Sequence, residues 1–414
     1  MDRIGCSLNR DPYYGQFFAH NHATSWIDCE LVAEHIASGR RIPAPFTTDI
    51  DQARQRILAS TTLRPMTVNI LGFLHMWRTA TAQQVARALG EPALASGKHR
   101  LWFYLLALGV IERGIQRGSV LTHTPALQAE ETIFRVGTHQ HYRRNLEPHL
   151  TIPERVAITG GANFDAKRQY PRHNVLTTEI GLRSLEQSWC ALALGEQFAG
   201  HDLLTLNPVG GHFLGTGGWA AADAVLIRKD GMRIAIELTT AGSPKFAEKA
   251  NRWGRLLSLH RLNDCGLAVI FVVAPTEHNQ IHVHMRSVRA AVAKAAQQNP
   301  GLVKDRTANR MGVVAWGDWW DKAGNGDFGS LSVWTPDGNQ WVRKRFADPP
   351  KLDNPQLLQV ISESRLLAGT LSRKRQPFGN DIAQLSADIY DVQLGDQKLS
   401  AALSSPLAIR QSDA

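Results

Sequence analysis

The chain has 414 residues and a net charge of +9, and 43% of its residues are hydrophobic and 20% charged. At roughly 100–200 residues per domain, this length predicts two or three globular domains, and the composition is not that of a disordered chain. The longest apolar run, CGLAVIFVVAP at residues 265–275, is shorter than the ~20 residues of a membrane-spanning helix. The four cysteines form no CxxC pair. We therefore expect a cytoplasmic protein with no membrane contact, disulfide scaffold or Cys-rich zinc site, and the basic balance favours a polyanionic partner.

Residues 61–125 show apolar residues at helical spacing in three segments, followed by a Gly-containing pair of short strands. Thr81 and Ser96 are expected N-caps, and Gly90 and Gly109 are expected to end the second and third helices. Three helices and a hairpin in this order are typical of a winged helix-turn-helix. The expected elements are helices at residues 67–79, 81–89 and 96–108 and a hairpin at residues 109–120.

Residues 150–345 alternate between helical and strand-like segments, which predicts a mixed α/β sheet covered by helices. The expected order is a helix at 174–194, strands at 223–228 and 232–238, a helix at 244–260, a strand at 267–274, a helix at 286–298, a strand at 311–316 and a Trp-rich hairpin at 331–342. On either side of these two regions we expect an irregular extension over residues 1–60, with one helix at 26–38, and a basic extension over residues 346–414.

The third helix of the 61–125 region begins with three residues that can contact DNA, Lys98, His99 and Arg100. A recognition helix presents the side chains of its first turn to the major groove. Cations there oppose the helix dipole, and a phosphate backbone would offset that cost. The alternative is a solvated helix end in a winged module that binds protein.

Two carboxylates lie at the far ends of a predicted hairpin, in AADAVLIRKDGMRIAIELTT. A two-residue turn would pair Asp223 with Leu238, whereas a three-residue loop with left-handed Gly231 would pair Asp223 directly with Glu237. Directly paired side chains have Cβ atoms ~4.5–5.5 Å apart, so the two carboxylates would repel unless a cation lies between them. The alternative is that Asp223 caps a strand and Glu237 is a buried acid paired with an arginine.

This arrangement resembles the PD-(D/E)XK nuclease superfamily, in which an Asp on one strand and Glu-x-Lys on the next support Mg²⁺ ions that activate water against a phosphodiester. The resemblance implies that Asp223 and Glu237 hold Mg²⁺ or Mn²⁺. Thr239 stands where the superfamily has lysine. Lys245 or Lys249, on the following helix, can reach back and take over the stabilisation of charge.

A third candidate cluster opens the helix before the hairpin, in PRHNVLTTEIGLRSLEQS. The same resemblance implies that Glu179 assists the metal site. His173 is a candidate for proton transfer or phosphate binding. The alternative for His173 is a helix cap packed under the sheet.

Taken together, the motifs RHNVLTTEIGLRSLEQ, AADAVLIRKDG and ELTTAGSPKFAEKANRW, behind a winged helix, resemble the replication-relaxation family of plasmid and integrative-element proteins, which are similar to MobC-type mobilisation relaxases. The resemblance covers roughly residues 65–275. The family often has Asp at the position of Thr239. The resemblance implies processing or relaxation of the element's DNA.

A competing pattern is the His-x-His at His282 and His284, which matches the metal-binding histidines of tyrosine relaxases if it lies on a strand. Such an enzyme also needs a nucleophilic tyrosine. Tyr390 is the only tyrosine downstream, and its context, SADIYDVQ, lacks the expected pairing, whereas Tyr13 and Tyr14 lie near the start, as some relaxase nucleophiles do.

Two basic clusters in the C-terminal third can neutralise phosphates, and nearby Trp334 and Trp341 can stack on bases or pack the hairpin. The clusters are Arg343, Lys344, Arg345 and Arg373, Lys374, Arg375. The Gly-rich stretch VGGHFLGTGGW at residues 209–219 lacks the GKS/T of a phosphate-binding loop, and we expect an ordinary loop there.

The sequence as a whole predicts an α/β (α+β overall) protein, with an N-terminal winged helix-turn-helix and a restriction-endonuclease-like mixed sheet flanked by helices. The expected function is metal-dependent nicking or relaxation of plasmid or conjugative-element DNA at a replication or transfer origin. The expected partner is double-stranded DNA; single-stranded DNA at an origin and a homodimer are left open. The alternative is a non-catalytic, sequence-specific regulator with a degenerate nuclease-like domain.

Overall fold

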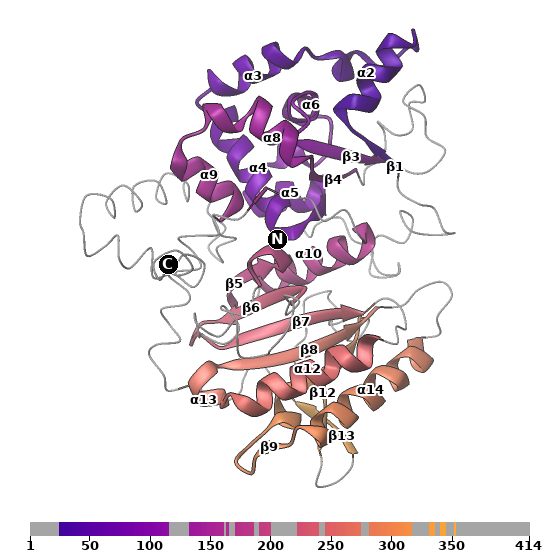
Figure 1. Ribbon diagram of the computed structural model, residues 1–414, viewed down its shortest axis with the longest axis vertical. Helices are drawn as coiled ribbons and strands as arrows, with labels where there is room; N and C mark the ends of the chain where they lie inside the picture. The colour runs from indigo at the N-terminus through magenta and orange to yellow at the C-terminus, as the bar shows by residue number, and fades with distance from the viewer. Residues whose placement is uncertain are drawn as a thin grey trace, which may run out of the picture. The chain divides into compact units, whose positions relative to one another are not determined.

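The protein is a mixed α+β protein, seen here as a computed structural model (Figure 1). The structure describes residues 25–115, 132–160, 163–164, 170–185, 190–199, 222–239, 245–274, 281–316, 331–335, 340–344 and 352. These residues divide into two compact units, with the boundary between residues 179 and 180, and each unit is described by itself.

The first unit contains a four-stranded antiparallel sheet in the order β1-β3-β4-β2, together with helices. Its strands are β1 (Ser25–Ile27), β2 (Thr79–Thr81), β3 (Ile111–Ile115) and β4 (Ile133–Val136). Its helices are α2 (Cys29–Ala37), α3 (Ile50–Leu58), α4 (Leu63–Trp77), α5 (Ala82–Leu89), α6 (Arg100–Ala107), α8 (His139–Asn145), α9 (Ile152–Thr159) and the first part of α10 (Pro171–Leu185), with single 3-10 turns at Ala44–Thr47, Pro92–Leu94 and Glu147–His149.

The core of the first unit forms around α4, which is buried on all sides from Thr67 to Trp77. The ring of Trp102 on α6 stacks on Phe134 of β4, with centroids 3.9 Å apart. No single helix in the described ranges is long and apolar enough to cross a membrane; only α3 and α4 together, bent by 106°, meet that length and composition.

The caps of the helices in this unit follow the sequence in part. Thr81 is the N-cap of α5, and Gly90 ends the helix in the left-handed conformation, both as predicted; Gln84, which was not predicted, completes a capping box with Thr81. The prediction for α6 was wrong at its start: His99 is the N-cap, and its ring nitrogen accepts from the Leu101 amide. Ser96 and Lys98 therefore precede the helix, and only Arg100 belongs to its first turn.

The sequence predicts that the segment now seen as β3 pairs with the residues that directly follow it, in a hairpin at residues 109–120. In the structure β3 pairs with β1 and β4 instead. Both edges of β3 are occupied, by β4 on one side and by β1 on the other. Residues 116–131 lie outside the described part of the chain. Residues 25–58 also contribute more than the one helix expected of the irregular extension, namely β1, α2 and α3.

The second unit is built on a seven-stranded mixed sheet in the order β13-β12-β11-β8-β7-β6-β5. β7, β8 and β11 run parallel, and the strands on either side of them are antiparallel. The strands are β5 (Cys190–Gly195), β6 (Ala224–Arg228), β7 (Arg233–Thr239), β8 (Leu267–Val273), β11 (Met311–Ala315), β12 (Leu331–Thr335) and β13 (Gln340–Lys344). The remaining elements are α12 (Lys245–Leu259), α13 (Leu262–Cys265), α14 (Ile281–Gln298), the small hairpin β9 (Gly301–Leu302) and β10 (Asp305–Arg306), and 3-10 turns at Glu196–Phe198 and Thr307–Arg310.

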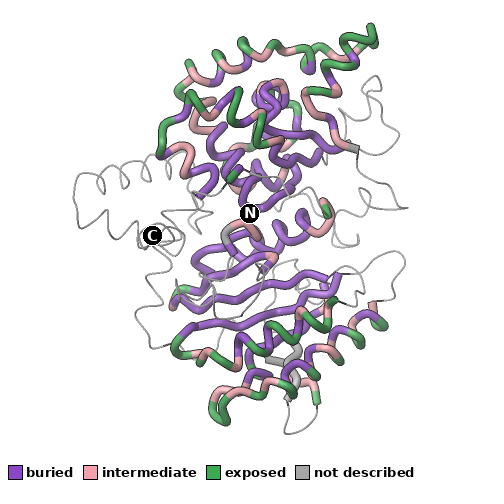
Figure 2. Tube along the Cα trace, viewed as in Figure 1, coloured by how far each residue is buried: buried purple, intermediate pink, exposed green. Residues whose placement is uncertain are grey.

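α12 and α14 pack side by side and both contact β8 (Figure 1). β7 and β8 are buried along their whole length, whereas the two helices carry exposed outer faces (Figure 2). A fully apolar strand such as LAVIFVV is typical of a parallel strand at the centre of a sheet.

Two predictions for this unit are wrong. The helix expected at residues 174–194 ends at Leu185, and residues 190–194 lie in β5. The His-x-His segment lies in the first turn of α14, not on a strand. On a helix, residues i and i+2 point about 200° apart, so His282 is exposed while His284 is buried, and the two rings cannot form one metal site.

Candidate functional site

The hairpin that carries the two carboxylates has the three-residue loop. The Arg228 amide donates to the Met232 carbonyl at 2.7 Å, and Gly231 has a φ of +87°. The ladder pairs Ala224 with Ile236, so the register places Asp223, one residue further on, opposite Glu237. Of the two registers that the sequence left open, the structure has the one that pairs the two acids directly.

Both carboxylates are held by groups from neighbouring strands and from α12. Asp223 accepts a hydrogen bond from the Leu238 amide at its Oδ2, with a length of 2.7 Å. Trp253 donates its Nε1–H to Oε1 of Glu237, also at 2.7 Å. Lys249 forms an ion pair with Oε2 of Glu237, and its Nζ lies 3.8 Å from Oδ1 of Asp223.

α12 delivers Lys249 and Trp253 together because residues four apart lie on the same side of a helix. The side chain of Glu237 is 2% exposed, that of Asp223 is 14% and that of Lys249 is 29%. The cluster is therefore closed on the side of Glu237 and open to solvent on the side of Lys249. Of the two lysines considered, the structure brings Lys249 to the acids, while Lys245 is exposed at the first residue of α12.

Burial and charge shift the protonation of this cluster. Burial raises the pKa of Glu237 to about 7; the Lys249 ammonium opposes this shift, and the Asp223 carboxylate adds to it. Burial lowers the pKa of Lys249, but the two carboxylates outweigh burial and raise the pKa of Lys249 above its ordinary value. Lys249 is therefore an ammonium at neutral pH, placed between two acids.

The donor set fits a hard divalent cation. Mg²⁺ is commonly held by one or two protein carboxylates, with water and substrate phosphate completing its shell. Asp223 and Glu237 provide such a pair. In the described part of the chain, no group of three or more His, Cys, Asp or Glu side chains is arranged to hold a metal by itself.

Thr239, which stands where the resembled motif has lysine, lies beside a histidine in this chain. Oγ1 of Thr239 lies 3.2 Å from Nε2 of His284, which reaches β7 from α14. Burial lowers the pKa of His284. Neither this pair nor the role of Trp253 was predicted. The four-residue spacing from Lys249 to Trp253 was a signal from which the role of Trp253 could have been predicted. The sequence holds no local signal for the contact between Thr239 and His284.

Glu179 and His173 both lie on α10. Glu179 is fully buried, and its Oε2 accepts from Nε2 of Gln84 on α5, at 3.1 Å. His173 is half-buried in the first turn of the helix, and its carbonyl accepts from the Thr177 hydroxyl at 2.9 Å. This hydrogen bond of Glu179 lies within the first unit.

Of the expected DNA contacts, Lys98 and Arg100 are exposed at the start of α6. Arg343 and Lys344 lie on β13, where the register pairs them with Ser332 and Leu331 of β12, and the same ladder pairs Trp334 with Trp341. The other four expected contacts lie outside the described residues: Arg345, Arg373, Lys374 and Arg375.

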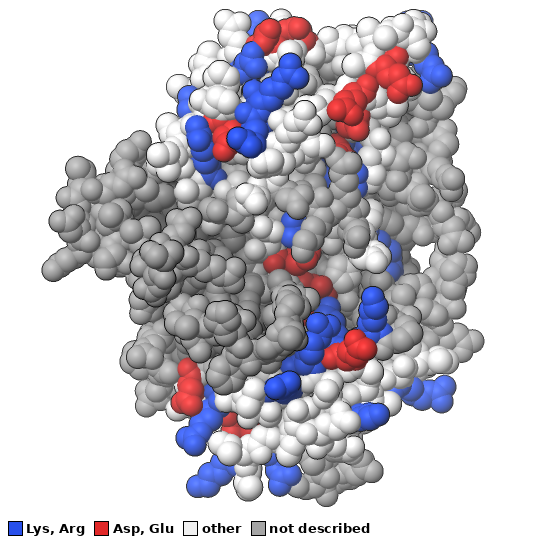
Figure 3. All heavy atoms as spheres, viewed as in Figure 1, with Lys and Arg blue, Asp and Glu red and all other residues white. Residues whose placement is uncertain are grey.

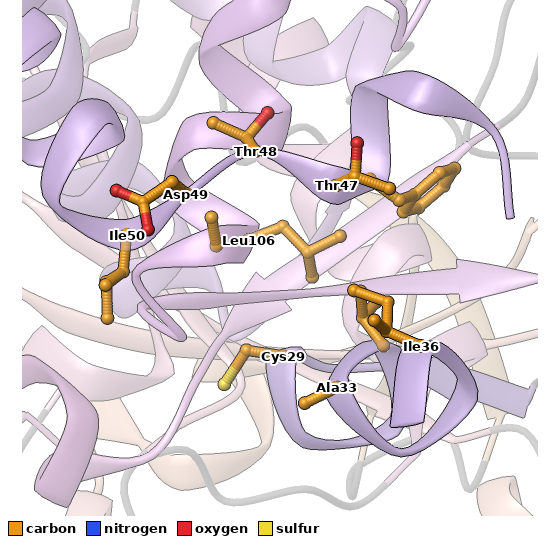
Figure 4. A pocket seen from close by; sticks show the side chains of 11 residues that line it. Cys29, Ala33, Ile36, Thr47, Thr48, Asp49, Ile50 and Leu106 are labelled. Atoms are coloured by element: carbon orange, nitrogen blue, oxygen red, sulfur yellow. The ribbon is translucent and has the colours of Figure 1, made fainter. Parts of the chain in front are cut away.

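The first unit also contains a pocket of about 310 Å³ between α2, the start of α3 and α6, lined by apolar side chains and by Thr47, Thr48 and Asp49 (Figure 4). Cys29 lies on its wall, with its Sγ 3.7 Å from Nε2 of His141. Burial, with the Asp28 and Glu30 carboxylates, raises the pKa of the Cys29 thiol to about 11. The thiol is therefore protonated at neutral pH and is a poor nucleophile despite its histidine neighbour.

Comparison of the chain with protein-family models, with curated proteins and with solved structures found no match.

Proposed function

We propose that the protein is a DNA-binding protein of a mobile genetic element that nicks DNA at a replication or transfer origin, with Mg²⁺ or Mn²⁺ held by Asp223 and Glu237. The observation that carries the proposal is the Lys249 ammonium beside two carboxylates that face each other across β6 and β7. Two acids and a lysine are the side chains that the resembled nuclease motif requires, with the lysine moved from the strand to α12.

The order of elements supports the same proposal. Helix α10, the antiparallel strands β5, β6 and β7, helix α12 and the parallel strand β8 follow one another along the chain. Asp223 immediately precedes β6, and Glu237 lies on β7. This order resembles a PD-(D/E)XK core. In the first unit, α4, β2, α5, α6, β3 and β4 follow in the order of a winged helix-turn-helix, whose recognition helix would be α6.

The chemistry of the proposed reaction is hydrolysis of a phosphodiester: a water oxygen bonds to phosphorus, and the bond from phosphorus to the leaving oxygen breaks. A bound Mg²⁺ would supply an activated water and neutralise the phosphate. Trp253 and the Leu238 amide hold the two carboxylates in place. Lys249, once released from Glu237, donates to the non-bridging phosphate oxygens. Glu179 and His173 remain predicted contributors.

The test is incubation of supercoiled plasmid carrying the origin of the cognate element with the purified protein, in Mg²⁺, in Mn²⁺ and in EDTA. We expect metal-dependent nicking that falls at least 100-fold in Glu237→Ala and in Lys249→Ala, because charge stabilisation of this kind is worth that much. Lys294→Ala removes an exposed lysine from α14 and is the charge-matched control.

The second candidate function is that of a non-catalytic DNA-binding regulator. The ion pair between Lys249 and Glu237 fits this function as well, because the lysine can serve solely to neutralise the buried acid. In that case the plasmid stays intact in every metal, and wild type and Glu237→Ala bind it equally well. That outcome would exclude the nuclease and leave the first unit as the site of function.

A further inference from the structure

The outer face of α12 carries basic side chains that the cluster of Asp223, Glu237 and Lys249 does not use. Lys245, Arg252 and Arg255 are exposed on this helix. At 100° per residue, they lie within about 80° of one another, and Lys245 and Arg252 border Lys249 on its solvent side. Figure 3 shows Lys and Arg side chains gathered over the region of α12 and α14, with a small acidic patch among them.

The two arginines of this face, Arg252 and Arg255, have no ion-pair partner in the ranges that the structure describes, and the exposed carboxylate of Glu248 has none there either. The Arg252 charge is close enough to Lys249 to lower the pKa of that lysine, one of the smaller effects on it. Like charges on adjacent turns of a helix repel each other.

We propose that the exposed face of α12, with Arg252 and Arg255 as its anchors, binds the sugar-phosphate backbone of the DNA strand that leads to the cluster. The inference rests on the proposed function for the identity of the partner. A phosphate beside Arg252 offsets the repulsion that the free helix carries. Because Lys249 links this face to the carboxylates, a strand bound along α12 passes the open side of the cluster.

The alternative is that this face of α12 binds no partner and that its charges only contribute to the solubility of the protein. The two explanations differ in the sign of one substitution. If phosphates lie along α12, removing the Glu248 carboxylate strengthens DNA binding, because it repels the same phosphates that Arg252 and Arg255 attract. If the face only meets solvent, Glu248→Gln leaves DNA binding unchanged.

The experiment measures binding of a labelled 30-base-pair duplex of mixed sequence by fluorescence anisotropy, in EDTA, from 50 to 250 mM KCl. We expect Arg252→Ala/Arg255→Ala to weaken binding on the order of tenfold at 100 mM and to lower the slope of log K against log salt by about 1.8, at about 0.9 for each phosphate contact. We expect Glu248→Gln to tighten binding roughly threefold. Arg56→Ala, which removes one exposed arginine from α3, is the control for loss of surface charge and should change each quantity by less than half as much as the double variant.

Binding in EDTA separates this inference from the proposed function. Nicking by wild type, with unchanged binding by the double variant and by Glu248→Gln, would overturn the inference and leave the function standing. Opposite shifts in the two variants without any nicking would support the DNA-binding face and reject the nuclease. A wild-type protein that does not bind the duplex would reject both.

Discussion

Glu237 is a buried acid whose two oxygens each have a partner from α12. A buried carboxylate without donors carries a large desolvation cost, so the Trp253 indole and the Lys249 ammonium are what make this residue tolerable on a central strand. Trp253 has no exposed surface of consequence and cannot touch a macromolecular substrate. We regard it as a positioning residue that fixes the direction of the carboxylate.

Removing the indole donor tests this view. Trp253→Phe keeps an aromatic ring but leaves Oε1 of Glu237 without its hydrogen bond, and we expect a loss of about 1.5–3 kcal/mol of unfolding free energy at pH 8, the range for a bond to a charged group. Trp102→Phe is the matched control, because its indole donates to the neutral Leu94 carbonyl. Its expected loss is about 0.5–1.5 kcal/mol, measured by urea unfolding. Equal losses would mean that Glu237 is uncharged at that pH.

The raised pKa of Glu237 gives a pH dependence with a definite sign. Its ordinary value is 4.5 and its value in the folded protein is about 7, so the folded state holds the proton more tightly. The stability that this group contributes is present below pH 4.5 and is lost as pH rises through 7. Relative to wild type, Glu237→Gln should therefore gain up to about 3 kcal/mol between pH 4.5 and pH 8, in EDTA. If Glu237→Gln instead lost unfolding free energy relative to wild type over this pH range, pairing with Lys249 would outweigh the cost of burying the carboxylate.

At the scale of elements, the β6–β7 hairpin sets the chemistry, because a shift of one residue would send Asp223 and Glu237 to opposite faces of the sheet. The loop that fixes this register depends on Gly231, the residue with a φ of +87°. An L-residue there meets its own carbonyl, which glycine avoids.

We expect Gly231→Ala to lower the free energy of unfolding by about 1–2 kcal/mol, measured by urea unfolding. Lys229→Ala, in the same loop and exposed, should change it by no more than about 0.5 kcal/mol. If Gly231→Ala left the free energy of unfolding unchanged, the loop could adopt another turn, and an interaction other than this loop would have to fix the register.

The hairpin was predictable because its information is local. Asp230 and Gly231 identify the turn, but the sequence left the loop length open, and the structure decides for the three-residue loop that pairs the acids. The Thr81 N-cap of α5 and the Gly90 that ends it were predictable for the same reason. The choice between Lys245 and Lys249 was not, since it depends on how α12 is rotated against the sheet, and that rotation is set by the burial of Trp253, Leu256 and Leu257.

The errors arose where distant contacts decide the structure. CALALG has no polar residue to show its period, and Ala and Leu favour helices, so only pairing with β6 makes it a strand. IHVHM alternates like a strand but opens α14, because the helical period continues to Gln298. The partner of β3 could not be predicted locally either, since β1 lies more than 80 residues before it and β4 follows an intervening stretch.

At the scale of the molecule, the chain holds two cores, one around α4 and one around β7 and β8. Each unit is large enough to fold around its own interior. We expect equilibrium unfolding in two transitions, with Leu71→Ala lowering the stability of one and Ile270→Ala that of the other, by about 2–4 kcal/mol each. Both side chains are fully buried. A single transition that both variants shift equally would show that the units unfold together.

The pairing of β1 with β3 also affects the tendency of this protein to aggregate through exposed strand edges. The four-stranded sheet ends on one side in β1 and on the other in β2, and both strands are only three residues long. The longer strand β3 lies inside, with β1 across the edge that would otherwise be free; Trp26 of β1 lies against the Arg135 guanidinium, 3.9 Å from the ring centroid. Short outer strands offer few backbone groups to a strand from another molecule, so residues 25–27 protect the first unit against edge-to-edge aggregation.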